Sequence, residues 1–479
     1  MICGAAWLPL FYFAFHVARL GAIAKDVRSF QIAYVVAFLG YAGVLWLWLR
    51  RPAPSNRSRA RWLIPCLLIR VIPLAVEPTD DAHRYLWEGH VQLAGHNPFA
   101  LAPDSAILES LRDEDWERIN HRDYPAIYPP LAQLEFWAAA ALHPSVYTLK
   151  VLHTIWDALG VVVLASILAA GGVAPARALL YGACPLVLTA FCVEGHVDSL
   201  MILLLLLCWR WDQRGHRMAA GIALGGSIAA KLFPVVFLPW FFFRSKRVLC
   251  AALVTVAILY LPYCSAGSSL FGSLGRFSST DSFFSFLGTM LELDFSNPAV
   301  RLGLAVSLAV VLTALAVGGA RGSARTGDAP ATVGEGADVR RRLGLKLVAG
   351  RGRRAWRAYV WPRGDRTDGL DFGRYGVAAT GLLVLTIPVV HYWYFALPMV
   401  FLAVRWHLAW MMAALLIVVY FGAQEAQVAT GTWAMPVDAP LWVWRGFVAA
   451  WVAQVWLDYR CIRPAPLTEN GGANQSPPR

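Results

Sequence analysis

Residues 146–170 read VYTLKVLHTIWDALGVVVLASILAA, a run long enough to cross a bilayer as a helix, which takes roughly 20 apolar residues. Similar runs, rich in Leu, Ala and Val and without strict alternation, recur along the chain. Because backbone groups in lipid must satisfy one another internally, these runs predict helices rather than barrel strands. With 58% hydrophobic and 15% charged residues, the chain is predicted to be an all-α polytopic transmembrane protein of about 11–13 helices.

The formal charge of +12 is explained by membrane topology rather than by nucleic-acid binding. Arginines sit in short loops beside apolar runs, as the positive-inside rule predicts for cytoplasmic loops. One such loop separates the runs at 32–49 and 62–76, and the 62–76 helix should therefore leave the membrane outward and place residues 77–130 on the exoplasmic side. That loop contains Arg50, Arg51, Arg57, Arg59 and Arg61.

The predicted organisation has five parts. In chain order, they are N-terminal helices and the basic loop (1–61), a catalytic membrane core with outer loops at 77–130 and 265–298 (62–318), an Arg- and Gly-rich cytoplasmic loop (319–373), C-terminal helices (374–457) and a tail (458–479). The stretch from Met1 to Ala24 has no basic n-region and is expected to be a retained anchor helix. Within the cytoplasmic loop, residues 345–361 mix Arg with apolar residues, and an interfacial helix is an alternative there to a disordered segment.

Two apolar segments do not fit a simple crossing. Leu131 to Leu142 would rise only roughly 18 Å, short of a hydrocarbon core of about 30 Å, and such helices are tolerated where they line a cavity. Met218 to Phe243 has basic residues at both ends. A hairpin that breaks near Lys231 to Pro234 satisfies the basic-loop rule at both ends and is favoured over one long helix.

Cysteine spacing indicates neither disulfide bonds nor a zinc site. Six of the eight Cys lie in apolar runs without CxxC spacing, where Cys is typically a small core residue. They are Cys66, Cys184, Cys192, Cys208, Cys250 and Cys264. No metal and no cofactor are expected.

The polar residues most suggestive of chemistry begin where the 62–76 helix ends. Adjacent carboxylates repel, so the Asp80-Asp81 pair is a poor choice for mere solubility. Arg84 follows Asp81 by one helical turn and is expected to hold that side chain ionised. One of the two Asp side chains suits a general base for an acceptor hydroxyl, and His83 and Arg84 suit a phosphate. The alternative is a helix end that merely collects charges at an interface.

Five motifs follow one another along the chain: DDAHRYLWEG at 80–89, GHNPF at 95–99, YPAIYPPL at 124–131, EGHVD at 194–198 and AKLFP at 230–234. The first three resemble the first outer loop of bacterial GT-C glycosyltransferases, most closely the polyprenyl-phosphate-mannose-dependent mannosyltransferases, and the last two agree in order. The resemblance covers roughly residues 62 to 265, although two helices precede the one that leads into the loop.

This resemblance implies metal-independent, inverting transfer of a hexose, with mannose expected, from a polyprenyl-phosphate sugar to a lipid- or glycan-linked acceptor. Asp81 aligns with the base of the family and Asp80 is its companion. Tyr85 and Tyr128, within the matching motifs, are candidate substrate-binding residues. The implied location is a bacterial inner or plasma membrane, with a multi-pass chain among membrane lipids and an active site that faces outward.

Further candidates are polar residues that interrupt apolar stretches. Lys231 suits the donor phosphate, because a Lys in hydrocarbon is costly unless it faces a cavity or an anion, and snorkelling to an interface is the alternative. Arg276 in the second outer loop is another phosphate candidate. The remaining candidates line the site or stack on sugar or lipid, and they are His196, Asp198, His391 and Tyr392.

Two other kinds of membrane protein remain open from the sequence. An O-antigen polymerase or ligase is also polytopic, but its main polar loop should lie late in the chain and be rich in Arg. A transporter should have repeated halves and charged residues at mid-membrane, and the sequence shows no such repeat.

Overall fold

The structure is a computed structural model that describes residues 2–49, 56–280, 283–327, 370–430, 434–435 and 438–462. The expected interfacial helix at 345–361 and the tail from 463 onward lie outside the described residues. The same holds for Arg50 and Arg51 of the basic loop and for most of the predicted cytoplasmic loop, whose first residues instead continue a helix to Gly327.

The described chain is helical apart from turns and one isolated bridge between Phe283 and Val389. The first half contains α1 (Ile2–Ala5), α2 (Leu8–Leu20), η1 (Ile23–Lys25), α3 (Val27–Leu49), α4 (Asn56–Val71), η2 (Ile72–Ala75), α5 (Asp80–Leu93), η3 (Ala106–Leu111), α6 (Glu114–Arg118), α7 (Pro130–Leu142), α8 (Val146–Ala170), η4 (Pro175–Ala178), α9 (Leu179–Gly182), α10 (Pro185–Leu188), η5 (Thr189–Val193), α11 (Asp198–Gln213) and α12 (Arg217–Ala230).

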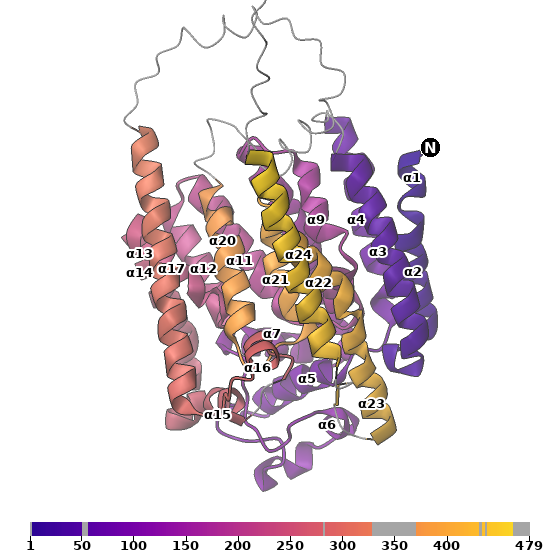
Figure 1. The fold of residues 1–479 in the computed structure, drawn as a ribbon. Helices are drawn as coiled ribbons and strands as arrows, with labels where there is room; N and C mark the ends of the chain where they lie inside the picture. The colour runs from indigo at the N-terminus through magenta and orange to yellow at the C-terminus, as the bar shows by residue number, and fades with distance from the viewer. Residues whose placement is uncertain are drawn as a thin grey trace, which may run out of the picture.

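The second half continues the bundle and returns to the same core (Figure 1). It contains η6 (Phe233–Phe237), α13 (Leu238–Arg244), α14 (Lys246–Tyr260), η7 (Leu261–Phe271), α15 (Gly272–Thr280), α16 (Phe286–Leu291), α17 (Pro298–Gly327), α20 (Asp371–Thr386), η9 (Tyr392–Phe395), α21 (Ala396–Leu402), α22 (Leu408–Leu416), η10 (Ile417–Phe421), α23 (Gly422–Thr430) and α24 (Ala439–Ile462).

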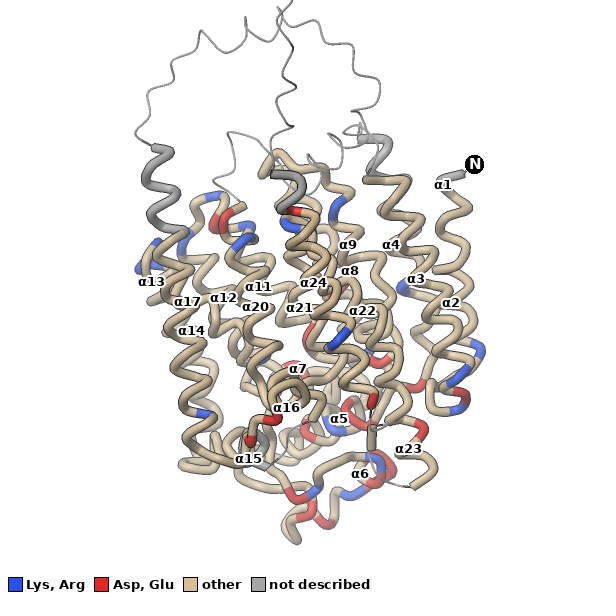
Figure 2. The backbone as a smooth tube through the Cα atoms, in the orientation of Figure 1, with Lys and Arg blue, Asp and Glu red and all other residues tan. Residues whose placement is uncertain are grey.

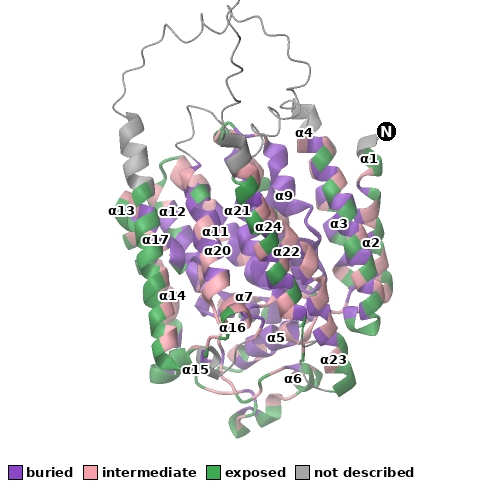
Figure 3. Cartoon of the chain, in the orientation of Figure 1, coloured by how far each residue is buried: buried purple, intermediate pink, exposed green. Residues whose placement is uncertain are grey.

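Among the described residues, five helical segments are long and apolar enough to cross a membrane, and up to seven if two bent pairs each count as one span. The five are Val27–Leu49, Val146–Ala170, Lys246–Arg276, Pro298–Gly318 and Leu408–Thr430. Four shorter apolar segments accompany them, and the long α14 and α17 are largely exposed (Figure 3). The chain is therefore a multi-pass membrane protein.

Proline positions explain where two apolar segments are interrupted. The apolar run from Pro175 to Val193 bends by 60° between Gly182 and Pro185, because a residue before proline is disfavoured in the α region. The predicted hairpin near Lys231 is present, since α12 ends at Ala230 and η6 begins at Phe233.

Charges at the far ends of this hairpin confirm its direction. Arg217 opens α12 and forms an ion pair with Asp212, and Arg244, which ends α13, also lies within electrostatic range of Asp212. Both basic ends thus meet at the same end of the bundle, where Figure 2 shows Lys and Arg gathered above α12 and α13. A single long helix would have separated them.

The stretch expected to be a polar loop after residue 77 begins instead with a buried helix. Helix α5 follows η2 after a bend of 77° and lies across the lower end of the bundle in Figure 1. Its stripe of Ala82, Tyr85 and Leu86 packs on α7. Gly89 allows this close approach, because a Cβ there would lie 2.4 Å from the Phe136 carbonyl oxygen.

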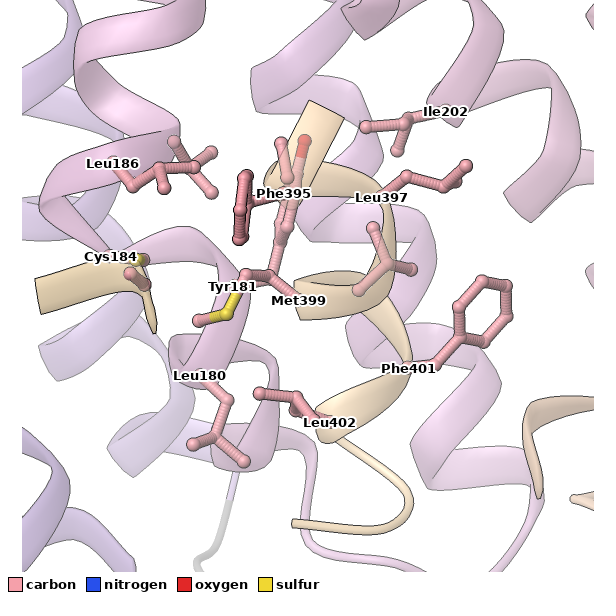
Figure 4. Packing of buried hydrophobic residues seen from close by; sticks show 14 of the residues in the cluster. Leu180, Tyr181, Cys184, Leu186, Ile202, Phe395, Leu397, Met399, Phe401 and Leu402 are labelled. Carbon is pink, nitrogen blue, oxygen red and sulfur yellow. The ribbon is translucent and has the colours of Figure 1, made fainter. Parts of the chain in front are cut away.

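The main core joins both halves of the chain. Figure 4 shows side chains of α9 and α10, including Leu180 and Leu186, gathered with those of η9 and α21, including Phe395 and Met399. Four of the six cysteines are buried as expected of small core residues, whereas Cys250 and Cys264 are exposed; all six are free thiols. The site described next is consequently built on a rigid, continuous core.

Candidate functional site

The candidate site lies where four helical segments are interrupted. The interruptions are residues 76–79 before α5, 194–197 before α11, 231–232 after α12 and 387–391 before η9. Non-helical backbone at membrane depth is tolerated where it is buried in protein or lines a cavity. Many of the polar residues singled out from the sequence lie in or next to these interruptions.

The acid pair opens α5, and Asn120 joins its two members. The Nδ2 atom of Asn120 donates to Asp80 Oδ2 at 3.0 Å and lies 3.3 Å from Asp81 Oδ1. The Tyr128 hydroxyl lies 3.5 Å from Asp81 Oδ2 and 3.3 Å from the Tyr85 hydroxyl. Asp81 therefore faces the tyrosines, whereas Asp80 also hydrogen-bonds Gln427 of α23.

The two carboxyl groups differ in acidity. Burial and the charge of Asp81 together raise the pKa of Asp80 to about 6. Burial also acts to raise the pKa of Asp81, but the neighbouring imidazole of His196 outweighs it and holds that pKa below its usual value. The pair therefore keeps Asp81 ionised, and Asp80 is the more readily protonated of the two.

An aromatic stack adjoins Asp81. The Nδ1 atom of His196 lies 3.5 Å from Asp81 Oδ2, and its ring stacks on Trp393 with centroids 3.7 Å apart. His391 also stacks on Trp393, at 4.4 Å, and donates to or accepts from the Tyr420 hydroxyl. Burial lowers the pKa of His196, and that of His391 to about 3, so both rings are neutral and act as hydrogen-bonding groups rather than cations.

Lys231 supplies positive charge to this region. Its Nζ forms an ion pair with Asp198 Oδ2 at 2.7 Å, and both side chains are nearly buried. The same nitrogen lies 4.6 Å from the Tyr394 ring centroid and 6.0 Å from that of Tyr128. Tyr128 thus stands between the lysine and Asp81.

The expected pairing of Arg84 with Asp81 is wrong. The Nε atom of Arg84 donates to Glu88 Oε1 at 2.6 Å, and its other nitrogens donate to the carbonyl oxygens of His121 at 2.9 Å and Tyr124 at 2.7 Å. We call Arg84, Glu88 and these carbonyls the arginine clamp. It fixes the loop that carries Asn120, and so Arg84 supports the acid pair through that loop.

Three further candidates have different surroundings. His83 Nδ1 lies 2.6 Å from Asp115 Oδ1 of α6. Arg276 forms an exposed ion pair with Asp123. Tyr392 is buried, with its ring 5.9 Å from that of His196. His196, Asp198, Lys231, Tyr128 and His391 are thus brought together around Asp81, while His83 is buried against Asp115 and Arg276 lies at the surface.

Several buried polar atoms near the acid pair have no hydrogen-bond partner among the described residues. They are the Nε2 atom of His196, Asp198 Oδ1, Ser199 Oγ, Glu194 Oε2 and the Tyr392 hydroxyl. An unpaired buried polar group typically costs about 1–3 kcal/mol, so such a concentration indicates a place for polar groups of a ligand.

Sequence reasoning did not single out Asn120, Trp393 or Glu194 individually. Burial raises the pKa of Glu194 to about 7, an effect that hydrogen bonds from Thr79 and Gln424 reduce. Glu194 and Trp393 lie within motifs noted from the sequence, but Asn120 belongs to none. No group of three or more His, Cys, Asp or Glu in the described part of the chain is arranged to hold a metal ion, and metal independence stays a prediction.

Comparison with known proteins gives one match. A family model described as "Alpha-(1->6)-mannopyranosyltransferase, N-terminal domain" matches residues 3–246, which include the acid pair, His196, Asp198 and Lys231. No curated protein and no solved structure matches the chain.

Proposed function

The chain belongs to the α-(1→6)-mannopyranosyltransferase family, and from that premise we propose that it transfers mannose from a polyprenyl-phosphate donor to a hydroxyl group of a lipid- or glycan-linked acceptor. Family membership sets aside the polymerase, ligase and transporter interpretations. The donor carrier, the roles of individual residues and the side of the membrane are the proposed parts.

The observation that carries the proposal is the position of Asp81. This ionised carboxylate is held by Asn120 and Tyr128 and lies beside His196, whose Nδ1 faces it and whose Nε2 has no partner among the described residues. A general base must reach the proton that it takes, and a fixed carboxylate surrounded by unsatisfied polar groups can do so once substrate hydroxyls enter.

In the proposed reaction, Asp81 takes the proton of the acceptor hydroxyl while that oxygen attacks the anomeric carbon of the donor. The bond between this carbon and the phosphate oxygen breaks, and polyprenyl phosphate leaves with the bonding electron pair. Displacement from the opposite face converts a β-linked donor into an α-linked product. Asp80, whose pKa of about 6 exceeds that of Asp81, then accepts the proton from its neighbour.

Lys231 suits the departing phosphate. Its Nζ lies 6.0 Å from the ring centroid of Tyr128, whose hydroxyl lies 3.5 Å from Asp81 Oδ2. Asp198 holds Lys231 in place through an ion pair in nearly dry surroundings. In this scheme the neutral rings of His196 and His391 donate hydrogen bonds, with no charge of their own. Arg84 and His83 are engaged elsewhere, so their predicted phosphate contacts receive less support.

The arrangement of charges supports an outward-facing site. Basic residues gather at the end of α11, α12 and α13, opposite the end where α5 and α6 lie (Figure 2). By the positive-inside rule the basic end is cytoplasmic. We therefore extend the proposal to an exoplasmic first loop, and to a GT-C architecture in which the shorter apolar segments complete about a dozen crossings.

The proposal is tested with detergent-purified protein and radiolabelled polyprenyl-phosphate-mannose, using a lipid-extract acceptor. Wild type should transfer label, and Asp81→Asn should lose transfer by about 10²–10⁴-fold, the usual size of a general-base contribution. Asp104→Asn changes an exposed carboxylate of the same outer loop and should transfer at the wild-type rate. Undiminished transfer by Asp81→Asn would remove the proposed base.

A further inference from the structure

A second polar feature lies apart from the acid pair, at the end of the bundle formed by the loops. A pocket of about 140 Å³ opens there between the first outer loop and α15. We call it the outer pocket, and it is lined by Tyr124, Pro125, Ser269, Gly272, Ser273 and Arg276. Its walls come from two segments about 150 positions apart, joined by a hydrogen bond from Ser273 Oγ to the Pro125 carbonyl at 3.0 Å.

The lining has hydroxyl, guanidinium and aromatic groups but little net charge. Arg276 Nη2 lies 2.7 Å from Asp123 Oδ2, and the Arg276 guanidinium lies 4.0 Å from the Tyr124 ring centroid. Both members of the ion pair are about half exposed. A carboxylate at the rim opposes an anionic ligand, whereas adjacent donors and acceptors beside an aromatic ring suit the hydroxyls and carbon faces of a neutral pyranose.

The arginine clamp connects this pocket to the acid pair. Asn120, which contacts both Asp80 and Asp81, is four residues from Tyr124, a separation of at most about 14 Å. The clamp shortens it, because Arg84 binds the carbonyls of His121 and Tyr124 with one guanidinium group. The Asp81 side chain is only 16% exposed, whereas Arg276 at the pocket is about half exposed, so the pocket is the more open of two positions that one short loop joins.

We propose that the outer pocket is an acceptor subsite that binds a pyranose unit of a glycan whose neighbouring hexose presents its 6-hydroxyl to Asp81. This inference rests on the proposed function and names the acceptor class for it. Arg276 thereby serves the sugar acceptor, in place of the donor phosphate predicted from sequence.

The test uses an octyl glycoside of an α-(1→6)-linked mannose disaccharide, which offers a free 6-hydroxyl, with polyprenyl-phosphate-mannose as donor. Arg276→Ala and Tyr124→Ala should each raise the KM of this acceptor by about tenfold, the effect of losing one good sugar contact. The KM of the donor should stay within a factor of about two. Arg118→Ala is the matched control, because Arg118 forms an equally exposed ion pair with Glu77 on the same loop.

A direct measurement separates failure of this subsite from failure of the proposed function. Saturation-transfer NMR of the disaccharide glycoside on purified protein needs no donor, and its signal should weaken in Arg276→Ala and persist in Arg118→Ala. A rise in donor KM instead of acceptor KM would assign Arg276 to phosphate and overturn the subsite. Binding that is equal in all variants would overturn it as well, whether or not wild type transfers mannose.

Discussion

Replacing Arg84 by Met distinguishes a structural clamp from a phosphate ligand. The side chains of Arg84 and Glu88 are 7% and 2% exposed. The substitution therefore leaves a buried carboxylate that, within the described part of the chain, accepts a side-chain hydrogen bond from Gln133 alone. Breaking a buried pair by removing one member costs about 3–5 kcal/mol. The same substitution also removes the hydrogen bonds to the carbonyl oxygens of His121 and Tyr124. Their loss is not added to this figure, because contributions from groups in one network are not additive.

The expected result is a large drop in the detergent unfolding temperature of Arg84→Met, accompanied by loss of transfer. Adding Glu88→Gln removes the unpaired charge and should recover most of the lost stability, because removing both members of a buried pair is far milder than removing one. Transfer should recover less, since the loop that carries Asn120 remains unclamped.

The assay is a pair of measurements on each variant, the unfolding temperature in detergent and the donor KM. Stability equal to that of wild type together with a greatly raised donor KM would refute the clamp and return Arg84 to the phosphate. Arg118→Met, an exposed arginine of the same loop, controls for a change of charge alone.

Three further predictions concern the acid pair, the lysine and helix packing. Burial and the charge of Asp81 raise the pKa of Asp80 to about 6, so this group binds more protons in the folded than in the unfolded state and its contribution to stability falls as pH rises from about 5 to 7, whereas the lowered pKa values of His196 and His391 act in the opposite direction. Comparison with Asp80→Asn isolates the first effect: the unfolding temperature of Asp80→Asn minus that of wild type should increase over this pH range, and a constant difference would contradict the raised pKa. Lys231→Met should raise the donor KM by tenfold or more (on the order of 1.4 kcal/mol or above) and leave the Asp198 carboxylate buried without its ion-pair partner. Adding Asp198→Asn should restore stability but not the donor KM. Kinetics identical to wild type would exclude Lys231 from phosphate binding. Gly89→Ala should lower the unfolding temperature, since its Cβ would meet the Phe136 carbonyl at 2.4 Å and overpacking typically costs about 1–3 kcal/mol; a stability equal to that of wild type would mean that α5 and α7 separate easily.

Long-range organisation was predictable where hydrophobic length alone decides it. Helix α8 has the bounds expected from its apolar run, and the hairpin at Lys231 follows from basic residues at both of its ends. Proline-induced bends and the buried helix α5 were harder, because charged residues such as Arg84 and Glu88 read as exposed until their mutual pairing is known.

Site contacts were predictable only as far as motifs reach. Asp81, His196, Asp198 and Lys231 stand in motifs noted from the sequence, and the fold brings them together. Asn120 has no such signal, because its role depends on a loop conformation fixed by Arg84. The sequence also could not show that Arg84 pairs with Glu88 rather than with Asp81, since both lie one turn away on the same helix. The nearby carbonyls of His121 and Tyr124, which also bind Arg84, favour Glu88.

The stack of His196, Trp393 and His391 crosses a boundary in the chain. His196 belongs to the segment matched by the family model, at residues 3–246, whereas Trp393 and His391 come from far beyond it. The matched segment therefore holds the acid pair and the lysine but not a complete site. A fragment ending near residue 246 should be catalytically silent by itself, and activity should return only when residues 370–462 are supplied as a second polypeptide that folds against it.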